Sequence, residues 1–285
     1  MIKEPAYAKI NLSLDVVGKR EDGYHDLEMI MASIDLYDDL TFQIIPENRI
    51  RVTCEHPQVP TDERNLVYQA IRLMKDRYHI REGLAVHIDK RIPVAAGLAG
   101  GSSDAAATIR AINRLFDLNL TFEEMLDIGL YLGSDVPYCI YGRMAYVTGR
   151  GENIEPLPSL ENVWVVVIHP DIAVSTKEIF SHVKVDQLAH PSVQQVKAAI
   201  LKGNYSEMVR HMGNALETIT FNLYPEVRQL KDEVASYQPD AVLMSGSGPT
   251  LFALTQDPTF AEQLKEKLDI PNGVKRTVFV VKLKR

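Results

Sequence analysis

The sequence predicts an α+β protein of two domains, with strands and helices mixed through both halves. Segments with apolar residues at every second position alternate with segments whose apolar residues repeat at helical spacing. A stretch at 152–162 has neither period and carries Pro156 and Pro158. We therefore expect it to join a domain of residues 1–155 to a domain of residues 156–285.

The first half is expected to open on a strand at residues 8–15. Ile10, Leu12 and Leu14 fall on one face of this strand, and Lys9 and Asn11 fall on the other. The segment REDGY at 20–24 has turn chemistry. Further strands are expected at 27–34, 40–45, 50–54, 84–88, 136–141 and 144–147, and helices at 65–78, at 104–115 and from a T-x-x-E capping box at 121 to Gly133.

The second half shows the same mixture of elements. Its first segment, VWVVVI at 163–168, is continuously apolar and predicts a buried strand. Further strands are expected at 241–244, 251–254 and 277–283, and helices at 176–182, 193–202, 205–212, 225–237 and 260–268.

Composition excludes several classes of function. The formal net charge of −7 disfavours a dominant nucleic-acid or anionic-membrane surface. No apolar run approaches the ~20 residues of a membrane helix, and the start lacks a signal-peptide pattern, so we expect a cytoplasmic protein. Cys54 and Cys139 stand alone, and the histidines lack HExxH spacing. A disulfide framework, a zinc site or a dedicated metal site is therefore not expected.

The segment PVAAGLAGGSSDAA at 93–106 is the most informative one. Small residues let a backbone approach a ligand closely, and the unpaired N–H groups of a following helix suit a phosphate. The segment is neither a Walker A loop nor a GxGxxG motif. The alternative is a Gly/Ala-rich loop before a core helix, with Ser102 as its N-cap.

Three further features could carry chemistry, each with a plainer alternative. Lys9 could face a ligand or only a solvated strand face. Asp135, in GSDVP at 133–137, could be a base or cation ligand, or only bond its own turn. The small-residue loop SGSGPT at 245–250 could line an anion site with its N–H groups, or be a flexible hairpin turn.

Together these segments resemble the motifs of the GHMP kinases, which phosphorylate small-molecule alcohols with ATP. The matching segments are AKINLSL at 8–14, the loop at 93–106 and SGSGPT at 245–250, with DGYH at 22–25, GSDVP at 133–137 and TGRGE at 148–152. The resemblance implies a ribosomal-protein-S5-like amino-terminal domain, a ferredoxin-like carboxy-terminal domain and a cleft between them. It also implies transfer of the γ-phosphoryl of ATP to the 2-hydroxyl of a cytidylylated methylerythritol, in non-mevalonate isoprenoid synthesis.

The resemblance also implies roles for individual residues. Lys9 and Asp135 would be the catalytic pair, and Mg²⁺ would accompany ATP, with Ser103 as a candidate ligand. The implied nucleotide-binding residues are Pro93, Val94, Ala95, Ala96, Gly97, Leu98, Ala99, Gly100, Gly101, Ser102, Ser103 and Asn65. The implied substrate-binding residues are Asn11, Tyr24, His25, Thr176 and Phe180, with the aromatic rings stacking on the cytosine.

Three residues of the loop depart from the family pattern, and two alternative functions remain open. Ala95, Ala96 and Ala99 stand where the family commonly has glycine, so we expect these positions to keep ordinary dihedrals. Another GHMP kinase, acting on mevalonate-type or sugar alcohols, and a non-catalytic nucleotide-binding homologue are the alternative functions. The expected partner is a small-molecule substrate, with no nucleic acid and no membrane, and the protein would be a monomer or homodimer.

Overall fold

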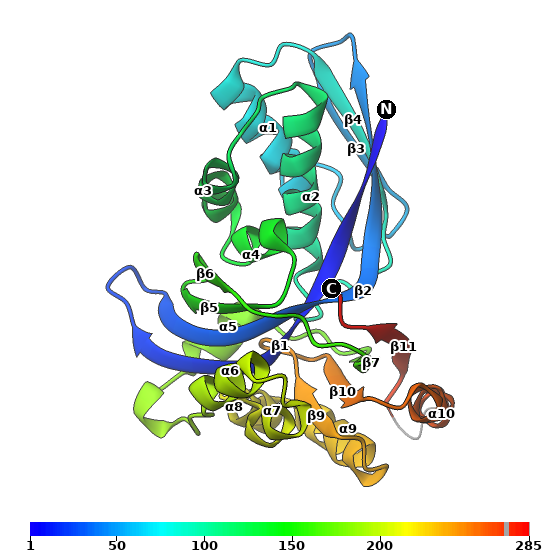
Figure 1. Ribbon diagram of the computed structural model, residues 1–285. Helices are drawn as coiled ribbons and strands as arrows, with labels where there is room; N and C mark the ends of the chain where they lie inside the picture. Colours follow the sequence, from blue (N-terminus) through cyan, green and yellow to red (C-terminus); the bar gives the residue numbers. More distant parts are fainter. Residues whose placement is uncertain (271–273, 285) are drawn as a thin grey trace. The chain divides into compact units, whose positions relative to one another are not determined.

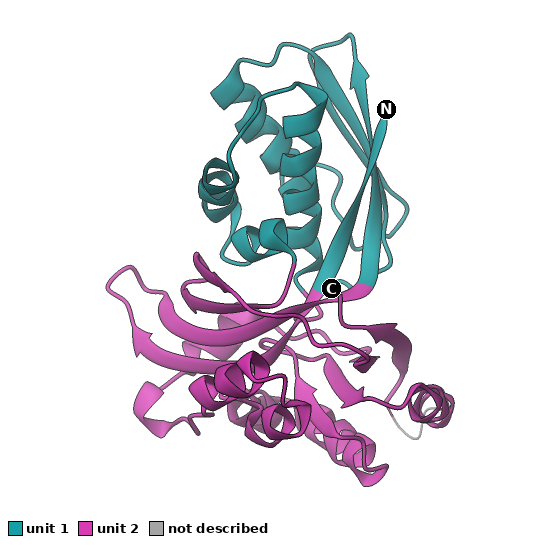
Figure 2. Cartoon of the chain, in the orientation of Figure 1, with its two compact units in different colours: residues 1–8, 36–94, 99–142 teal, residues 9–35, 95–98, 143–285 magenta. Residues whose placement is uncertain are grey.

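The computed structural model describes residues 1–270 and 274–284 (Figure 1). The chain divides into two compact units, unit 1 with residues 1–8, 36–94 and 99–142, and unit 2 with residues 9–35, 95–98 and 143–285 (Figure 2). Two long strands, β1 (Ile2–Lys19) and β2 (His25–Ile45), run through both units. Because the units interleave along the chain, a boundary between residues 155 and 156 stays a prediction.

Unit 1 is organised around one central helix, α2, which contacts α1, α3 and α4. The helix buries its small and branched residues, among them Ala105, Ile109 and Ile112, as the apolar spacing predicts. Strand β3 pairs in parallel with β4, which pairs antiparallel with β2. The elements are β3 (Ile50–Cys54), α1 (Leu66–Tyr78), β4 (Gly83–Asp89), α2 (Gly100–Leu115), α3 (Phe122–Leu132) and α4 (Val136–Tyr141).

Two expectations for unit 1 are corrected. The strand expected at 136–141 is wrong, because these residues form α4, with Pro137 in its first turn and the left-handed Gly142 at its end. Proline fits the first turn of a helix, and a short apolar run cannot by itself distinguish strand from helix. Helix α2 begins at Gly100 rather than at residue 104. The capping box at Thr121 and the end at Gly133 are confirmed for α3.

Unit 2 contains an antiparallel sheet in the order β11-β7-β10-β9. In chain order these are its fourth, first, third and second strands. Helices precede β9 and β11, with α9 packed on β9 and α10 packed on β7, β10 and β11. This β-α-β-β-α-β order confirms the ferredoxin-like expectation for this part of the chain. Among the described residues, no helix is long and apolar enough to span a membrane.

The remaining elements of unit 2 follow the expected order, with additions. Strand β5 pairs with β2 and β6, and β8 pairs in parallel with β1. Strands β6 and β8 and helix α8 were not expected from the sequence. The elements are β5 (Ala145–Gly149), β6 (Asn153–Pro156), β7 (Trp164–Pro170), α5 (Thr176–Ser181), a 3-10 turn (Val185–Gln187), α6 (Val193–Leu201), α7 (Tyr205–His211), β8 (Gly213–Asn214), α8 (Glu217–Leu223), α9 (Pro225–Ser236), β9 (Ala241–Met244), β10 (Leu251–Thr255), α10 (Pro258–Leu268) and β11 (Arg276–Lys282).

Strand β1 is buried on both of its faces from residue 8 to residue 16. Its apolar face lies in the core as expected. The polar face is also buried, with Lys9 4% exposed and Asn11 fully covered. A buried cation requires compensating polar partners, since its desolvation is costly. The alternative of a solvated strand face for Lys9 is therefore wrong.

The imidazole of His190 joins the segment before α6 to β1. Its Nδ1 lies 2.8 Å from Oδ1 of Asp15, and its Nε2 lies 3.0 Å from the carbonyl oxygen of Val185. Because both ring nitrogens face acceptors, the geometry favours the doubly protonated ring. The hydrogen bond that His190 donates to Asp15 accordingly raises the pKa of His190.

We expect this pair to make stability depend on pH. A histidine whose pKa is raised by folding adds stability below its unfolded pKa, and that stability is lost as pH rises through the folded pKa. At pH 6 His190→Gln should therefore lower Tm by about 1–3 °C, because the His190 side chain is 44% exposed and solvent weakens its pairing with the buried Asp15. The difference from wild type should shrink toward pH 9. Adding His190→Gln to an Asp15→Asn background should cost less, and a pH-independent difference would contradict the pairing.

Candidate active site

The buried ammonium of Lys9 is held by the next inward polar residue of β1. Its Nζ donates to Oδ1 of Asn11 over 2.8 Å, and the Nδ2 of Asn11 lies 3.4 Å from the sulfur of Met29. The backbone N–H of Lys9 donates to the carbonyl of Leu98, inside the glycine-containing loop. The strand thus fixes both the side chain of Lys9 and one residue of the predicted phosphate loop.

The loop at 93–99 has left-handed residues at every second position. The φ angles are 54° at Ala95, 72° at Gly97 and 57° at Ala99. The expectation of ordinary dihedrals is therefore wrong for Ala95 and Ala99, although a left-handed alanine costs roughly 1–2 kcal/mol. The surrounding contacts, including the bond from Lys9 to Leu98, hold the loop in this form. Alternating left-handed residues are typical of concave turns whose N–H groups converge on an anion.

The helix after the loop begins on backbone alone. Ala99 occupies the N-cap of α2, and within the described part of the chain no side chain caps it. The alternative of Ser102 as the N-cap is therefore wrong. The hydroxyl of Ser103 is buried and donates to the carbonyl of Tyr7 over 2.6 Å. The first N–H groups of this 16-residue helix lack intrahelical acceptors, as in other helix ends that bind phosphate.

The loop Ser245–Thr250 joins β9 to β10 and lies against Gly97 and Lys9. The hydroxyl of Ser245 donates to the carbonyl of Gly97 over 3.0 Å. Gly246 has a φ of 58°, and a Cβ added there would lie 3.3 Å from that carbonyl oxygen and 3.5 Å from Nζ of Lys9. Glycine is required here both for the left-handed backbone and for the close approach. Unit 2 therefore brings three segments far apart in sequence to one place.

Thr176 joins the same cluster from the first turn of α5. Its hydroxyl lies 2.9 Å from the hydroxyl of Ser247. The loop is closed by backbone bonds from Ser245 to Thr250 and from Gly248 to Ser245. The loop connects the antiparallel strands β9 and β10, so the hairpin part of the alternative is confirmed. A flexible turn is not supported, because Ser245 and Thr250 are fully buried and bonded.

The predicted aromatic residues lie partly together. The rings of His25 and Phe180 have centroids 5.5 Å apart and a tilt of 35°. Burial lowers the pKa of His25, with a smaller contribution from the charge of Lys19, so the ring is neutral near pH 7. Tyr24 is half-exposed, and its ring faces the guanidinium of Arg150, whose Cζ lies 3.9 Å from the ring centroid.

Arg150 lies within the segment TGRGE, and the sequence alone assigns it no role. Its Nε is buried and has no hydrogen-bond partner among the described residues. A guanidinium over a tyrosine face is attracted to the ring and fixes its orientation. Arg150 is identified as part of the site by its contact with Tyr24, a residue distant in sequence.

Two predicted residues have other surroundings. Asn65 is the N-cap of α1, where its Oδ1 accepts from the N–H of Val67 and its Nδ2 donates to the carbonyl of Pro60. Asp135 begins α4, and its carbonyl accepts from the N–H of Cys139. Asp135 belongs to unit 1 and Lys9 to unit 2, so their joint role stays a prediction.

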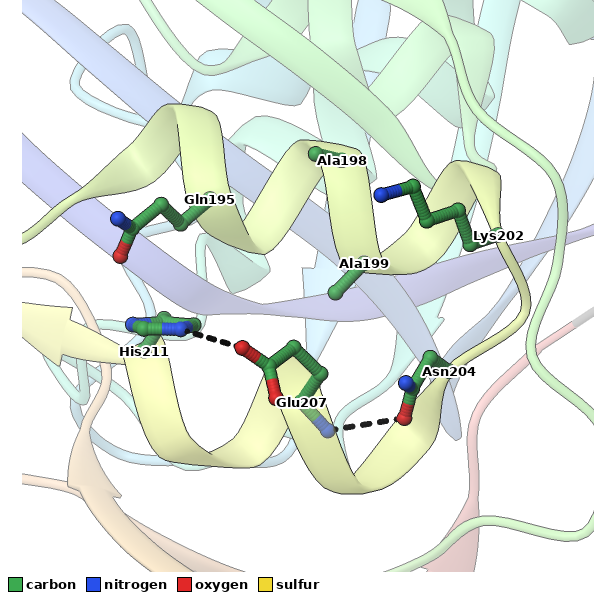
Figure 3. Close-up of a pocket in the computed structure, with 7 residues that line it drawn as sticks. All are labelled: Gln195, Ala198, Ala199, Lys202, Asn204, Glu207 and His211. Atoms are coloured by element: carbon green, nitrogen blue, oxygen red, sulfur yellow. Dashed lines mark hydrogen bonds and ion pairs between the residues drawn. The ribbon is translucent and has the colours of Figure 1, made fainter.

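A hollow of about 340 Å³ lies in unit 2 along α6 and α7 (Figure 3). Glu207 pairs with His211 over 2.9 Å, and Asn204 caps α7 through the N–H of Glu207. The described residues that line it include none of those predicted for the site, so we do not place the reaction there. They are Gln195, Ala198, Ala199, Lys202, Asn204, Glu207 and His211.

Comparison with known proteins gives the family. Residues 65–143 match the model of the GHMP kinases N terminal domain, and residues 196–272 match that of the GHMP kinases C terminal. A 4-diphosphocytidyl-2-C-methyl-D-erythritol kinase of Enterococcus faecalis is 50% identical over 92% of this chain and 93% of its own. A protein of the same name from Bacillus subtilis is 49% identical over 90% of this chain and 88% of its own.

Solved structures agree with this assignment. A crystal structure of 4-(cytidine 5'-diphospho)-2C-methyl-D-erythritol kinase has a TM-score of 0.81 at 30% identity, with 99% of each chain covered. A homoserine kinase from Cytophaga hutchinsonii has a TM-score of 0.79 at 22% identity over 99% of this chain and 94% of its own, which shows the fold alone. The predicted two-domain GHMP kinase fold is confirmed. The chain therefore belongs to the GHMP kinase family, and it is a small-molecule kinase.

Proposed function

We propose that this kinase transfers the γ-phosphoryl of ATP to the 2-hydroxyl of 4-diphosphocytidyl-2-C-methyl-D-erythritol. The observation that carries the proposal is the identity of about 50% with kinases of that name along nearly the whole chain. The cluster of Lys9, Asn11, Gly97 and Gly246 supports it, because it places a buried cation beside two small-residue loops suited to phosphate. We further propose action in the cytoplasm as a monomer or homodimer, without nucleic acid or membrane.

In the proposed reaction Asp135 takes the proton of the acceptor hydroxyl. Lys9 orients that hydroxyl and stabilises the charge on the moving phosphoryl group. Phosphoryl transfer depends mainly on positioning and charge neutralisation, which these two groups can supply. The bond from Lys9 to Asn11 supports the role of Lys9, since it fixes the ammonium before substrate binds.

The nucleotide is proposed to bind at residues 93–103, with Asn65 nearby. The left-handed turns at 95, 97 and 99 and the uncapped start of α2 support this assignment, because they present backbone N–H groups to an anion. Asn65 would contribute through α1, whose first turn it caps.

Mg²⁺ enters the proposal together with ATP. Among the described residues no group of three or more His, Cys, Asp or Glu side chains could hold a metal ion. Mg²⁺ commonly keeps several waters and is held by substrate phosphates with few protein ligands. A site with one hydroxyl ligand from the protein therefore fits such an ion. The lone pairs of the Ser103 hydroxyl are the proposed protein contact, and the ion would neutralise phosphate charge.

The acceptor is proposed to contact Asn11, Tyr24, His25, Thr176 and Phe180. The contact between the rings of His25 and Phe180 supports a flat aromatic surface suited to cytosine. Thr176 is bonded to the loop that lies against Lys9, which supports a place nearer the reacting hydroxyl.

A substrate panel tests the function. Purified protein with Mg²⁺ and ATP is offered the cytidylylated methylerythritol, mevalonate and homoserine, and ADP release and phosphorylated product are measured. We expect turnover of the cytidylylated alcohol alone. Turnover of another alcohol in preference would overturn the substrate, and binding of ATP without any turnover would favour a non-catalytic homologue.

Tyr24→Ala is expected to act on the acceptor rather than on the nucleotide. Loss of stacking should raise KM for the cytidylylated alcohol about 5- to 150-fold, corresponding to ~1–3 kcal/mol. KM for ATP should change less than about twofold. Tyr131→Ala is the matched control, because this tyrosine is 83% exposed on α3. Equal changes in the two KM values would argue against a stacking role.

A further inference from the structure

The loop beside Lys9 is held by a buried amide that lies outside the segments matching the GHMP kinases. Asn214 is 7% exposed and forms part of β8, where it pairs with Leu14 of β1. Its Nδ2 donates to the carbonyl of Met244 over 2.8 Å and to the carbonyl of Gly246 over 2.7 Å. Its Oδ1 accepts from the N–H of Leu216 over 2.9 Å.

This pattern requires an amide. Two donated bonds and one accepted bond on a single short side chain match asparagine, whereas a carboxylate has no donor. Both acceptors flank Ser245, so the amide fixes the carbonyls on either side of that residue. A buried carbonyl that loses its donor costs free energy, and the backbone shifts to recover a partner.

The segment that Asn214 fixes is the one that approaches Lys9. Gly246 lies against Nζ of Lys9 and the carbonyl of Gly97, and Ser245 bonds the same carbonyl. A movement of Ser245–Gly246 would therefore alter the surroundings of the ammonium and of the phosphate loop together. Strand β1 carries Lys9 and also pairs with β8, so Asn214 connects the two sides of this cluster.

We propose that Asn214 is a positioning residue for phosphoryl transfer. It sets the backbone of Ser245–Gly246 against Lys9 and Gly97 without contacting either substrate. The inference rests on the proposed function, in which Lys9 stabilises the transferring phosphoryl. A misplacement of about 1 Å near reacting groups can cost about 10²-fold in rate.

The test is Asn214→Asp, which keeps the shape and the acceptor for Leu216 but removes both donors. We expect kcat to fall at least about tenfold, with KM for ATP and for the alcohol changed less than about threefold. Asn204→Ala is the control, because it removes an asparagine hydrogen bond at the exposed N-cap of α7 in the same unit. It should lower Tm while leaving kcat within about twofold.

Asn214→Ser provides a second variant, because its hydroxyl donates one bond and introduces no charge. It should show an intermediate loss of kcat, and it decides the question if the aspartate variant does not fold. Folded variants with kcat within threefold of wild type, or a loss of kcat that Asn204→Ala reproduces at equal Tm, would overturn the inference. The wild-type protein is first tested on the panel of alcohols, so that an error in the proposed acceptor is detected separately from an error about Asn214. The kcat of each variant is then compared with wild type on the alcohol that the wild-type protein phosphorylates.

Discussion

Asp135→Asn and Lys9→Met are each expected to lower kcat by at least about 10²-fold, the low end for loss of a positioned catalytic group. Asp135→Asn removes the acceptor for the hydroxyl proton and keeps the size of the side chain. Lys9→Met keeps the length of a side chain that is 4% exposed and removes its charge. Because both groups are proposed to act mainly in the transition state, the two KM values should change little.

Matched controls separate this loss from general effects. Lys19→Met removes an exposed ammonium at the end of the same strand, and Asp127→Asn removes an exposed carboxylate from α3 in the unit of Asp135. Both should retain kcat within about twofold. Folding is verified by thermal unfolding and by nucleotide affinity. A folded Asp135 or Lys9 variant with near-normal kcat would end the catalytic assignment.

Local patterns predicted most elements of the fold because they depend on short-range spacing. Apolar spacing and capping residues predicted the positions of helices α1 and α3. Short apolar runs predicted those of strands β7 and β10. The strand expected at 136–141 was wrong because this six-residue apolar segment has no clear period. Pro137 fits the first turn of the helix that forms there. Helix α8 was missed because its apolar residues Ile219, Phe221 and Leu223 fall at every second position, which is not a helical period. A contact distant in sequence, from the hydroxyl of Thr220 to the carbonyl of Ser247, holds the segment.

The site was predictable only as separate motifs. The small-residue loops can be identified from their composition, but their contact through Gly97 and Ser245 depends on tertiary structure. Asn214 and Arg150 have no local signal, since each acts on a residue far away in the chain. The left-handed alanines show the same limit, because tertiary contacts override a local preference of roughly 1–2 kcal/mol.

A buried ionic cluster in unit 1 holds both ends of the loop at 93–99, where the nucleotide is proposed to bind. Nζ of Lys90 lies 2.5 Å from Oδ2 of Asp38 and 2.8 Å from Oδ2 of Asp104 on α2. Oδ1 of Asp38 accepts from the N–H groups of Arg91 and Ile92, directly before the loop. All three charged side chains are at most 5% exposed. Oδ1 of Asp104 has no hydrogen-bond partner among the described residues.

The protonation of this cluster follows from its burial. Burial raises the pKa of Asp104 to about 7, with Asp38 adding to the shift and Lys90 opposing it. Burial lowers the pKa of Lys90, but the two carboxylates outweigh it and the net shift is upward. Because Asp104 binds its proton more tightly in the folded state, its contribution makes stability fall as pH rises from about 4 to about 7.

Lys90→Met is therefore expected to lower the free energy of unfolding by about 3–5 kcal/mol, the cost of leaving buried charge unpaired. The loss should be larger at pH 8 than at pH 5, because the remaining carboxylates can take up protons at the lower pH. Denaturant unfolding at the two pH values measures both effects. Lys265→Met, which breaks an i,i+4 pair with Asp269, should cost about 0.5 kcal/mol or less.

The double variant Lys90→Met/Asp104→Asn distinguishes the charge from the packing. Removing one carboxylate together with the ammonium leaves less unpaired charge, so it should recover part of the stability lost by Lys90→Met. A loss below about 1 kcal/mol for Lys90→Met, or no recovery in the double variant, would show that the cluster does not hold the loop through its charges. Since the cluster anchors residues 91 and 92 and the start of α2, a confirmed loss should be accompanied by weaker ATP affinity in the variant that still folds.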